Sequence, residues 1–251
     1  MIELKDVSAG YGKEDVIKNV TIDFPKGLTV IIGPNGSGKS TLVKTAMGLT
    51  DWSGLITYDG RNIADLSLKE RAIEAGILLQ DHVSPDLSVR RLVRHGRYSR
   101  TEWPRKYNQV DEEVTNRALK TAGINGLASR KVCELSGGQR QRAYLALLLC
   151  QQPETYFFDE PNAALDLESQ LELQELMVRL AKDHPVVTVI HDLGMALKIA
   201  DRVVLMDEGR IKFIGTPQQL EKTHLIEQVF HVSMKKAVID GQPEYCFRKA
   251  V

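Results

Sequence analysis

Apolar and polar positions alternate along the first part of the chain. The segments MIELKDVSAGYG and VIKNVTIDFPKG follow this alternation and each ends in a glycine turn, which is typical of half-buried antiparallel strands. LTVIIG is a continuous run rich in β-branched residues, which predicts a strand buried on both faces. It leads into a glycine-rich loop and then into STLVKTAMGLT, which has helical spacing up to Gly48.

The section from about residue 81 to residue 134 differs in composition. The segment SVRRLVRHGRYSRTEWPRKYNQVDEEVTNRALKTAGI is charged, rich in arginine and mostly helical in period, with a break at Trp103-Pro104. It lies between two sections rich in predicted strands. We therefore expect an inserted helical subdomain.

Strands and helices alternate again from Thr155 onward. TYFFDE and VVTVIHD predict buried strands, ESQLELQELMVRLAKD and GMALKIA predict helices, and RVVLMDEGRI predicts a hairpin. Strands separated by helices indicate an α/β fold whose sheet is mostly parallel and has helices on both faces. The tail from Thr216 is expected to begin as helix and then to end less regularly.

Composition narrows the function classes. The 251 residues include 33 Lys+Arg and 33 Asp+Glu, so the formal net charge is zero, which argues against broad electrostatic binding to nucleic acid. The cysteines Cys133, Cys150 and Cys246 form no paired motif, which favours buried or incidental thiols in a reducing compartment. The start of the chain lacks a signal-peptide core, and no run reaches about 20 apolar residues. We expect a cytosolic chain unless a partner holds it at a membrane.

The glycine-rich loop GPNGSGKST predicts a phosphate-binding site. It fits G-x-x-x-x-G-K-[ST], and it stands between a predicted strand and a predicted helix, as this motif requires. Its glycines let backbone N–H groups face the phosphates, its lysine adds a charge, and a hydroxyl ligates Mg²⁺. The alternative is a glycine turn that merely starts a helix. The expected nucleotide-binding residues are Gly33, Pro34, Asn35, Gly36, Ser37, Gly38, Lys39, Ser40 and Thr41.

A P-loop alone leaves kinases, GTPases and many ATPases open. The segment TYFFDE narrows the choice among these classes, because a strand that ends in Asp159 places a carboxylate near the outer coordination shell of a metal ion. Glu160 can then polarise a water molecule for attack on the γ-phosphate. An acidic strand end without function is the alternative. After a P-loop, the pair indicates nucleotide hydrolysis, with Ser40 and Asp159 as metal-binding residues.

A third motif indicates the family. The signature LSGGQ, with the P-loop before it and TYFFDEP after it, resembles the ATP-binding-cassette ATPases over about residues 2–232. The resemblance implies a P-loop ATPase core of RecA type with an antiparallel β subdomain, formed by residues 1–80 and 135–230. It also implies a helical subdomain at about residues 81–134 and a C-terminal tail at residues 231–251.

The resemblance also implies roles for single residues. Tyr11 is expected to stack on adenine with Val16 packing nearby, Gln80 to contact Mg²⁺ and the attacking water, Asp166 to couple two active sites, and His191 to contact the γ-phosphate. Tyr11 could instead be a surface tyrosine, and a lone histidine such as His191 is usually structural. His191 nevertheless follows a buried strand, as Glu160 does, which favours a catalytic role for it together with Lys39.

Two features of the sequence carry no role or put one in doubt. The segment PNAALD has Asn162 and Ala163 where the family usually shows a Thr-Ser pair, so the hydroxyl contacts normally made there are in doubt. The remaining histidines have no context that indicates chemistry, and no role is assigned to His82, His95 or His231.

The signature motif predicts a dimer. Ser136 lies 97 positions after Lys39, with the predicted helical subdomain between them. In the family, two copies pair head to tail, and the signature of one covers the ATP that the other holds. The residues Ser136, Gly137, Gly138 and Gln139 are then expected to supply donors and a helix N-terminus to the γ-phosphate.

A further resemblance, to the ATPases of importers, implies which proteins this ATPase works with. Only 56 positions separate Gln80 from Ser136, which excludes the long coiled coils of DNA-repair members, and translation-type members usually carry two cassettes. The segment VRRLVRHGRYSR resembles ATPases of importers for iron-siderophore, heme and cobalamin complexes, although Ser99-Arg100 replaces their usual Pro-His. The expected partners are a second copy, two transmembrane permease subunits and, indirectly, a substrate-binding protein, at the cytoplasmic face of the membrane. A soluble ATPase of iron–sulfur assembly type remains the alternative.

Overall fold

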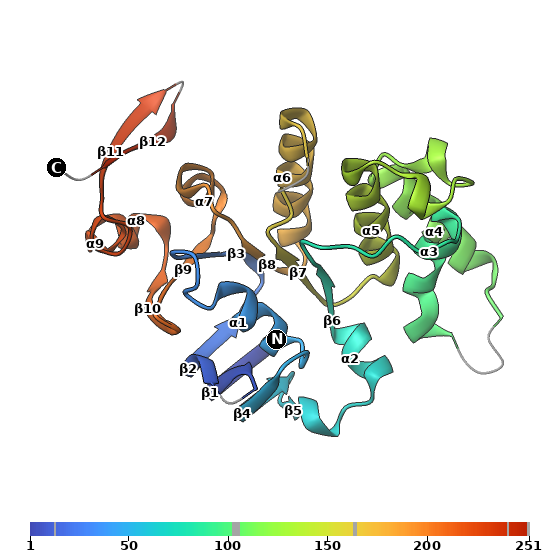
Figure 1. Cartoon of the computed structure of the whole chain (residues 1–251), viewed down its shortest axis with the longest axis horizontal. Helices are drawn as coiled ribbons and strands as arrows, with labels where there is room; N and C mark the ends of the chain where they lie inside the picture. Colours follow the sequence, from blue (N-terminus) through green and yellow to red (C-terminus); the bar gives the residue numbers. More distant parts are fainter. Residues whose placement is uncertain (13, 102–105, 163–164, 240, 250–251) are drawn as a thin grey trace. The chain divides into compact units, whose positions relative to one another are not determined.

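The computed structural model describes residues 1–12, 14–101, 106–162, 165–239 and 241–249. The chain forms two compact units (Figure 1). The flanking unit comprises Met1–Ala64 and Met177–Val251, and the central unit comprises Asp65–Leu176.

The flanking unit begins with an antiparallel sheet. Its strand order is β2-β1-β4-β5, as the alternating pattern of the first segments predicts for β1 and β2. β1 is buried at Ile2 and Leu4 and again at Val7 and Ala9, because alternate side chains of a strand point to the same side and a register shift between Leu4 and Val7 changes the alternation by one residue. The strands are β1 (Ile2–Tyr11), β2 (Glu14–Phe24), β4 (Asp51–Tyr58) and β5 (Arg61–Asn62).

A second sheet of the flanking unit is mostly parallel. β3 lies between β8 and β9, and it is buried on both faces, as its continuous apolar run predicts. β9 and β10 form the predicted hairpin. The elements are β3 (Gly27–Ile32), α1 (Lys39–Ala46), β8 (Pro185–Val189), α7 (Leu193–Ile199), β9 (Arg202–Asp207) and β10 (Arg210–Gly215).

The C-terminal tail is more regular than the sequence pattern predicts. After α8 (Pro217–Glu221) and α9 (Leu225–Phe230), β11 (Val232–Ile239) and β12 (Gln242–Lys249) form an antiparallel hairpin. The expectation of an irregular end was wrong, because the Asp-Gly pair at residues 240–241 is a strong hairpin signal. Lys198 of α7 forms an ion pair with Glu244 of β12, which holds the hairpin to the rest of this unit.

The central unit is built around the helix α5. α3 and α4 pack against it, and β6 pairs with β7 in parallel. The predicted break at Trp103-Pro104 lies outside the described residues. The elements are α2 (Leu68–Glu74), β6 (Ala75–Leu78), α3 (Val89–Arg94), the 3-10 helix η2 (His95–Arg100), α4 (Gln109–Thr121), α5 (Gly137–Gln151) and β7 (Thr155–Asp159), with short 3-10 turns at Asn125–Leu127 and Val132–Glu134. Two elements cross the boundary between the units in the sequence, the 3-10 turn Ile63–Asp65 and α6 (Leu167–Ala181).

These elements confirm the predicted α/β class with a mostly parallel sheet and N-terminal antiparallel strands. Cys133 and Cys246 are exposed free thiols and Cys150 is a buried one. Within the part of the chain that the structure describes, no helix has the length and apolar character needed to cross a bilayer.

Candidate functional site

The glycine-rich loop follows β3 and leads into α1, in the order that the sequence predicts. Gly33 and Gly38 have φ angles of 156° and 97°, values that side chains with a Cβ rarely adopt. A Cβ at Gly33 would lie 2.3 Å from the Met206 carbonyl oxygen, and one at Gly38 would lie 2.8 Å from Ile17 Cγ2. Glycine is therefore required at both positions by the backbone and by the close packing around the loop.

Lys39 lies inside this loop. Its side chain is buried, and its ammonium donates hydrogen bonds to the carbonyl oxygens of Gly33 (2.9 Å) and Pro34 (2.8 Å). No side chain caps the N-terminus of α1, so its first N–H groups remain available to an anion. Ser37 Oγ is buried and has no hydrogen-bond partner among the residues that the structure describes. The loop can thus present backbone donors, a positive charge and a free hydroxyl to a phosphate group.

Tyr11 and Val16 lie on the hairpin that β1 and β2 form. The Tyr11 side chain is 58% exposed at the end of β1 and pairs in register with Glu14. Val16 lies against the glycine-rich loop, because its carbonyl oxygen would be 3.4 Å from a Cβ at Gly38. An exposed aromatic ring and a half-buried valine therefore stand on the hairpin that packs against the loop.

The register of the parallel strands places His191 beside the glycine-rich loop. Ile31 of β3 is opposite Val189 of β8, and Gly33 and His191 each follow two residues later. Because the carboxyl ends of parallel strands meet at one edge of a sheet, both residues lie at the same edge. His191 is exposed there.

The register of β6 and β7 likewise places two predicted site residues of the central unit, Gln80 and Glu160, at one edge of the sheet. Leu78 of β6 is opposite Phe158 of β7, so Gln80 and Glu160 both lie two residues beyond the last registered pair. Asp159 is buried at the end of β7, whereas Gln80 is exposed. Glu160 has a φ angle of 51°, a strained value for a residue with a Cβ, and such strain is concentrated at functional sites.

The signature motif forms the N-terminus of α5. Ser136 is the N-cap, and its hydroxyl accepts a hydrogen bond from the Gln139 backbone N–H (3.4 Å), while the Gln139 side-chain oxygen accepts one from the Ser136 N–H (3.1 Å). This capping box fixes the first turn. The residues of this turn are not buried, so the free N–H groups and the positive end of the helix dipole face solvent at Gly137 and Gly138.

Asp166 precedes α6 and acts as a capping residue. Its carboxylate accepts a hydrogen bond from the Ser169 backbone N–H (2.8 Å), and this bond holds the pKa of Asp166 below its usual value. The side chain is exposed. Asn162 is described, but Ala163 lies outside the described residues, so the departure from the family pattern at these positions stays a sequence observation.

Comparisons with known proteins establish the family. A family model described as ABC transporter matches residues 17–163. The chain belongs to the ABC transporter family. The ATP-binding protein FepC for ferric enterobactin transport, from Escherichia coli strain K12, is 38% identical over 231 residues, which cover 90% of this chain and 85% of that protein.

Two further relatives extend this similarity. The siderophore transport ATP-binding protein YusV of Bacillus subtilis strain 168 is 38% identical over 92% of this chain and 86% of that protein. The hemin import ATP-binding protein HmuV of Chelativorans sp. strain BNC1 is 34% identical over 97% of this chain and 96% of that protein. These relatives confirm that the chain is the ATP-hydrolysing subunit of an ABC transporter.

Solved structures agree with this family. A metal-chelate type ABC transporter in an inward-facing conformation has a TM-score of 0.81 and 25% identity over 98% of this chain and 96% of that chain. The dimeric cassette MJ0796 has a TM-score of 0.77 and 26% identity over 86% of this chain and 99% of that chain. The fold of this chain is therefore that of an ABC ATPase.

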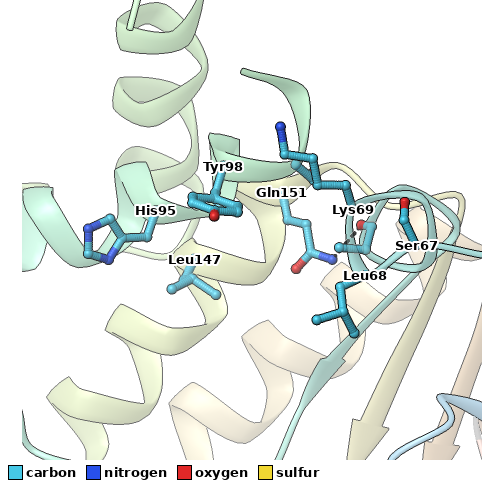
Figure 2. A pocket seen from close by; sticks show the side chains of 10 residues that line it. Ser67, Leu68, Lys69, His95, Tyr98, Leu147 and Gln151 are labelled. Atoms are coloured by element: carbon cyan, nitrogen blue, oxygen red, sulfur yellow. Dashed lines mark hydrogen bonds between the residues drawn. The ribbon is translucent and has the colours of Figure 1, made fainter. Parts of the chain in front are cut away.

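The central unit of this ABC ATPase also contains a pocket of about 540 Å³, whose lining is mostly apolar (Figure 2). In Figure 2, Ser67–Lys69 at the start of α2 face Tyr98 of η2 and Leu147 and Gln151 of α5. The Lys69 ammonium lies 5.9 Å from the centre of the Tyr98 ring. The lining residues are Ser67, Leu68, Lys69, Ala72, His95, Gly96, Tyr98, Ser99, Leu147 and Gln151.

The wall of this pocket is bound to the end of α5. Arg97 donates hydrogen bonds to the Cys150 carbonyl oxygen (3.3 Å) and to Gln152 Oε1 (2.9 Å), and Arg100 donates one to the Gln152 carbonyl oxygen (2.6 Å). Cations at a helix C-terminus satisfy its last carbonyl groups and oppose its dipole. The segment HGRYSR therefore forms one wall of the pocket and the C-terminal cap of the signature helix.

Sequence reasoning found part of this region. The resemblance to importers singled out HGRYSR, and two arginines around Tyr98 were a visible signal. The contribution of α2 had no such signal, because Ser67–Lys69 are ordinary capping and surface residues. Val89 at the start of α3 is completely buried, whereas Leu87, two residues before it, is partly exposed.

Proposed function

We propose that the chain drives an importer of iron-siderophore, heme or cobalamin-type complexes. The relatives FepC, YusV and HmuV carry names of ferric enterobactin, siderophore and hemin transport, and the similarity covers most of each chain. It favours a transport ATPase over a soluble iron–sulfur assembly ATPase. The observation that carries the catalytic part is the buried Lys39 inside a glycine-rich loop.

ATP binding and hydrolysis are assigned to the residues described above. Tyr11 stacks on adenine and Val16 packs beside it, while residues 33–41 hold the phosphates. Glu160 polarises the attacking water and His191 contacts the γ-phosphate. Charge that develops on the phosphate oxygens is stabilised by Lys39 and by the N-terminus of α1.

Mg²⁺ is the metal that fits the proposed donors. Ser40, Gln80 and Asp159 offer hydroxyl, amide and carboxylate oxygens, which are the ligands that Mg²⁺ prefers. Mg²⁺ bound with the nucleotide neutralises phosphate charge during transfer. Asp159 is buried at the end of β7, and Glu160 follows it with a positive φ angle.

Two copies of the chain are proposed to pair head to tail. The exposed turn at Ser136–Gln139 offers backbone donors and no lysine, so it suits a nucleotide whose phosphates already contact Lys39 of the other copy. Asp166, exposed at the start of α6, couples the two composite sites. This arrangement gives the signature turn at Ser136–Gln139 a function that one copy alone cannot use.

The pocket of the central unit is proposed as the place where a permease subunit docks. It is apolar, it opens beside an exposed Leu68, and one wall caps the signature helix. Two permease subunits would hold the ATPase at the cytoplasmic face of the membrane, and a substrate-binding protein would act through them. In this proposal residues 81–134 form the helical subdomain, residues 1–80 and 135–230 the ATPase core, and residues 231–251 the tail.

The hydrolysis assignment is tested by steady-state turnover. Glu160→Gln is expected to lower ATP turnover by about two to three orders of magnitude, because the attacking water loses its base. Glu154→Gln, just before β7 and away from the sheet edge of Glu160, is the matched control and keeps normal turnover. Hydrolysis near the normal rate in Glu160→Gln would contradict the assignment.

A further inference from the structure

The first turns of the signature helix carry a cluster of side chains that the proposed chemistry does not use. Arg140 and Gln141 both adjoin Tyr144 on the surface of α5, because residues three and four apart on a helix are neighbours. All three contact loops that follow strands of the central unit. These contacts connect α5 to the loops that carry Gln80, after β6, and Glu160, after β7.

Tyr144 and Arg140 hold the segment directly after Gln80. The rings of His82 and Tyr144 are stacked, with centroids 4.2 Å apart and an angle of 4° between their planes. The Tyr144 hydroxyl donates a hydrogen bond to the Val83 carbonyl oxygen (2.9 Å), and Arg140 donates one to Ser84 Oγ. Three consecutive residues are thus bound to one helix face.

Gln141 holds the segment after Glu160. Its side-chain amide donates a hydrogen bond to the Pro161 carbonyl oxygen (2.6 Å), and Gln141 is buried. Since Pro161 directly follows Glu160, the same face of α5 fixes the loops that carry both predicted hydrolytic residues of this unit. Ser136 begins the same helix.

The loop after Gln80 depends on these contacts for its position. Residues 79–87 form neither helix nor strand, so no ladder of backbone hydrogen bonds fixes them. His82 is the aromatic contact of this loop with α5, and its ring is half-buried. Its Nε2 atom is buried without a hydrogen-bond partner among the described residues, which fits a neutral ring that is packed rather than solvated.

We infer that the stack of His82 on Tyr144 is a positioning contact for ATP hydrolysis. It holds Gln80 in a fixed place relative to the signature helix, so that the loop of one active site and the Ser136 turn that serves the other move together. His82 and Tyr144 touch neither nucleotide nor water in this role. The inference rests on the proposed function, since it assigns a task to the same ATPase site.

Steady-state ATP hydrolysis by the full chain tests this role. Tyr144→Leu removes the ring and is expected to lower kcat about tenfold, because displaced groups lose much of their catalytic effect. The KM for ATP is expected to stay within about twofold, since the nucleotide-binding loop belongs to the flanking unit. Tyr144→Phe keeps the ring, loses only the hydroxyl bond to Val83 and is the matched control, with a kcat that stays much closer to that of the unchanged chain than that of Tyr144→Leu.

A second variant approaches the stack from the other side. His82→Ala is expected to reproduce the loss in kcat, and His82→Phe to restore most of it. If the two residues act through one contact, the double variant His82→Ala with Tyr144→Leu is no slower than the slower single variant. Melting temperatures of all variants show whether each one is folded.

Several results would overturn the inference. A folded Tyr144→Leu protein with unchanged kcat would do so, as would equal losses in Tyr144→Phe and Tyr144→Leu, or single losses that multiply in the double variant. A different result marks failure of the proposed catalytic site itself: hydrolysis in the unchanged chain that Glu160→Gln does not reduce would overturn the role of Glu160 in polarising the attacking water, and with it the site that the inference assumes.

Discussion

A buried ion pair inside the central unit allows a strong test of how this unit is stabilised. Arg97 Nε lies 2.9 Å from Asp111 Oδ1, and the two side chains are only 8% and 6% exposed. Asp111 also accepts a hydrogen bond from the Asn108 backbone N–H (3.1 Å) at the start of α4. The carboxylate therefore balances a buried charge and completes the capping box whose N-cap is Asn108.

The magnitude of its loss follows from these contacts. Removal of one partner of a buried ion pair costs about 3–5 kcal/mol, because the other charge stays buried without compensation. Loss of the reciprocal hydrogen bond of the capping box, from the Asn108 N–H to Asp111, adds about 1 kcal/mol. We expect Asp111→Ala to lower the free energy of unfolding by about 4–6 kcal/mol, which at about 2–4 °C per kcal/mol corresponds to a decrease in Tm of about 8–24 °C.

The neighbouring residue provides the control. Glu112 forms ion pairs with Arg90 and Arg94, but its side chain is 38% exposed, and such surface pairs contribute about 0–1 kcal/mol. Urea denaturation and thermal melting of Asp111→Ala and Glu112→Ala, side by side, measure the difference. Equal stability of the two variants would refute the argument that burial makes the Arg97 pair essential.

Three further predictions address the loop, the histidine and the pocket. Gly38→Ala should abolish ATP binding measured by isothermal titration, because its Cβ would lie 2.8 Å from Ile17 Cγ2; normal affinity would contradict the tight packing of the loop. Burial, assisted by Arg140 and opposed by Asp81 and Gln141, lowers the pKa of His82 below its usual value. As pH falls, His82 is therefore protonated in the unfolded chain at a higher pH than in the folded chain. The free energy of unfolding then decreases below about pH 6.5. His82→Phe should flatten this pH dependence in urea titrations at pH 7.5 and 5.5, and an unchanged slope would remove His82 as its source. Leu68→Asp, at a pocket residue that is 82% exposed, should keep ATP turnover of the isolated chain but abolish stimulation by the permease; full stimulation would exclude the pocket as the docking site.

Much of the fold could be predicted from the sequence because its elements have strong local signals. The apolar run before Gly33 and the run that ends at Asp159 can only be buried strands, and both are. The hairpin at residues 232–249 was missed because its strands are mostly exposed and show little hydrophobic alternation. The Asp-Gly pair at residues 240–241 of the sequence was a better signal of the hairpin than the pattern of its strands.

In the candidate site, too, only the features with a local sequence signal could be predicted. The type and spacing of glycine, lysine and acidic residues indicate phosphate chemistry, so the segments that form the phosphate-binding loop and the acidic strand end could be predicted from the sequence alone. The packing around them could not, because contacts such as His82 with Tyr144 join positions 62 residues apart. No local pattern indicates which histidine meets which tyrosine. Such pairs depend on the register of β6 and β7 and on the rotation of α5.

Light scattering with ATP and Mg²⁺ measures the mass of the Glu160→Gln protein in solution, and so tests whether two copies of the chain pair around ATP. Slow hydrolysis should trap two nucleotides between the glycine-rich loop of one copy and the Ser136 turn of the other. We expect twice the mass of one chain with ATP and Mg²⁺, and the mass of one chain when EDTA removes the metal. A single-chain mass with ATP and Mg²⁺ at high protein concentration would contradict it.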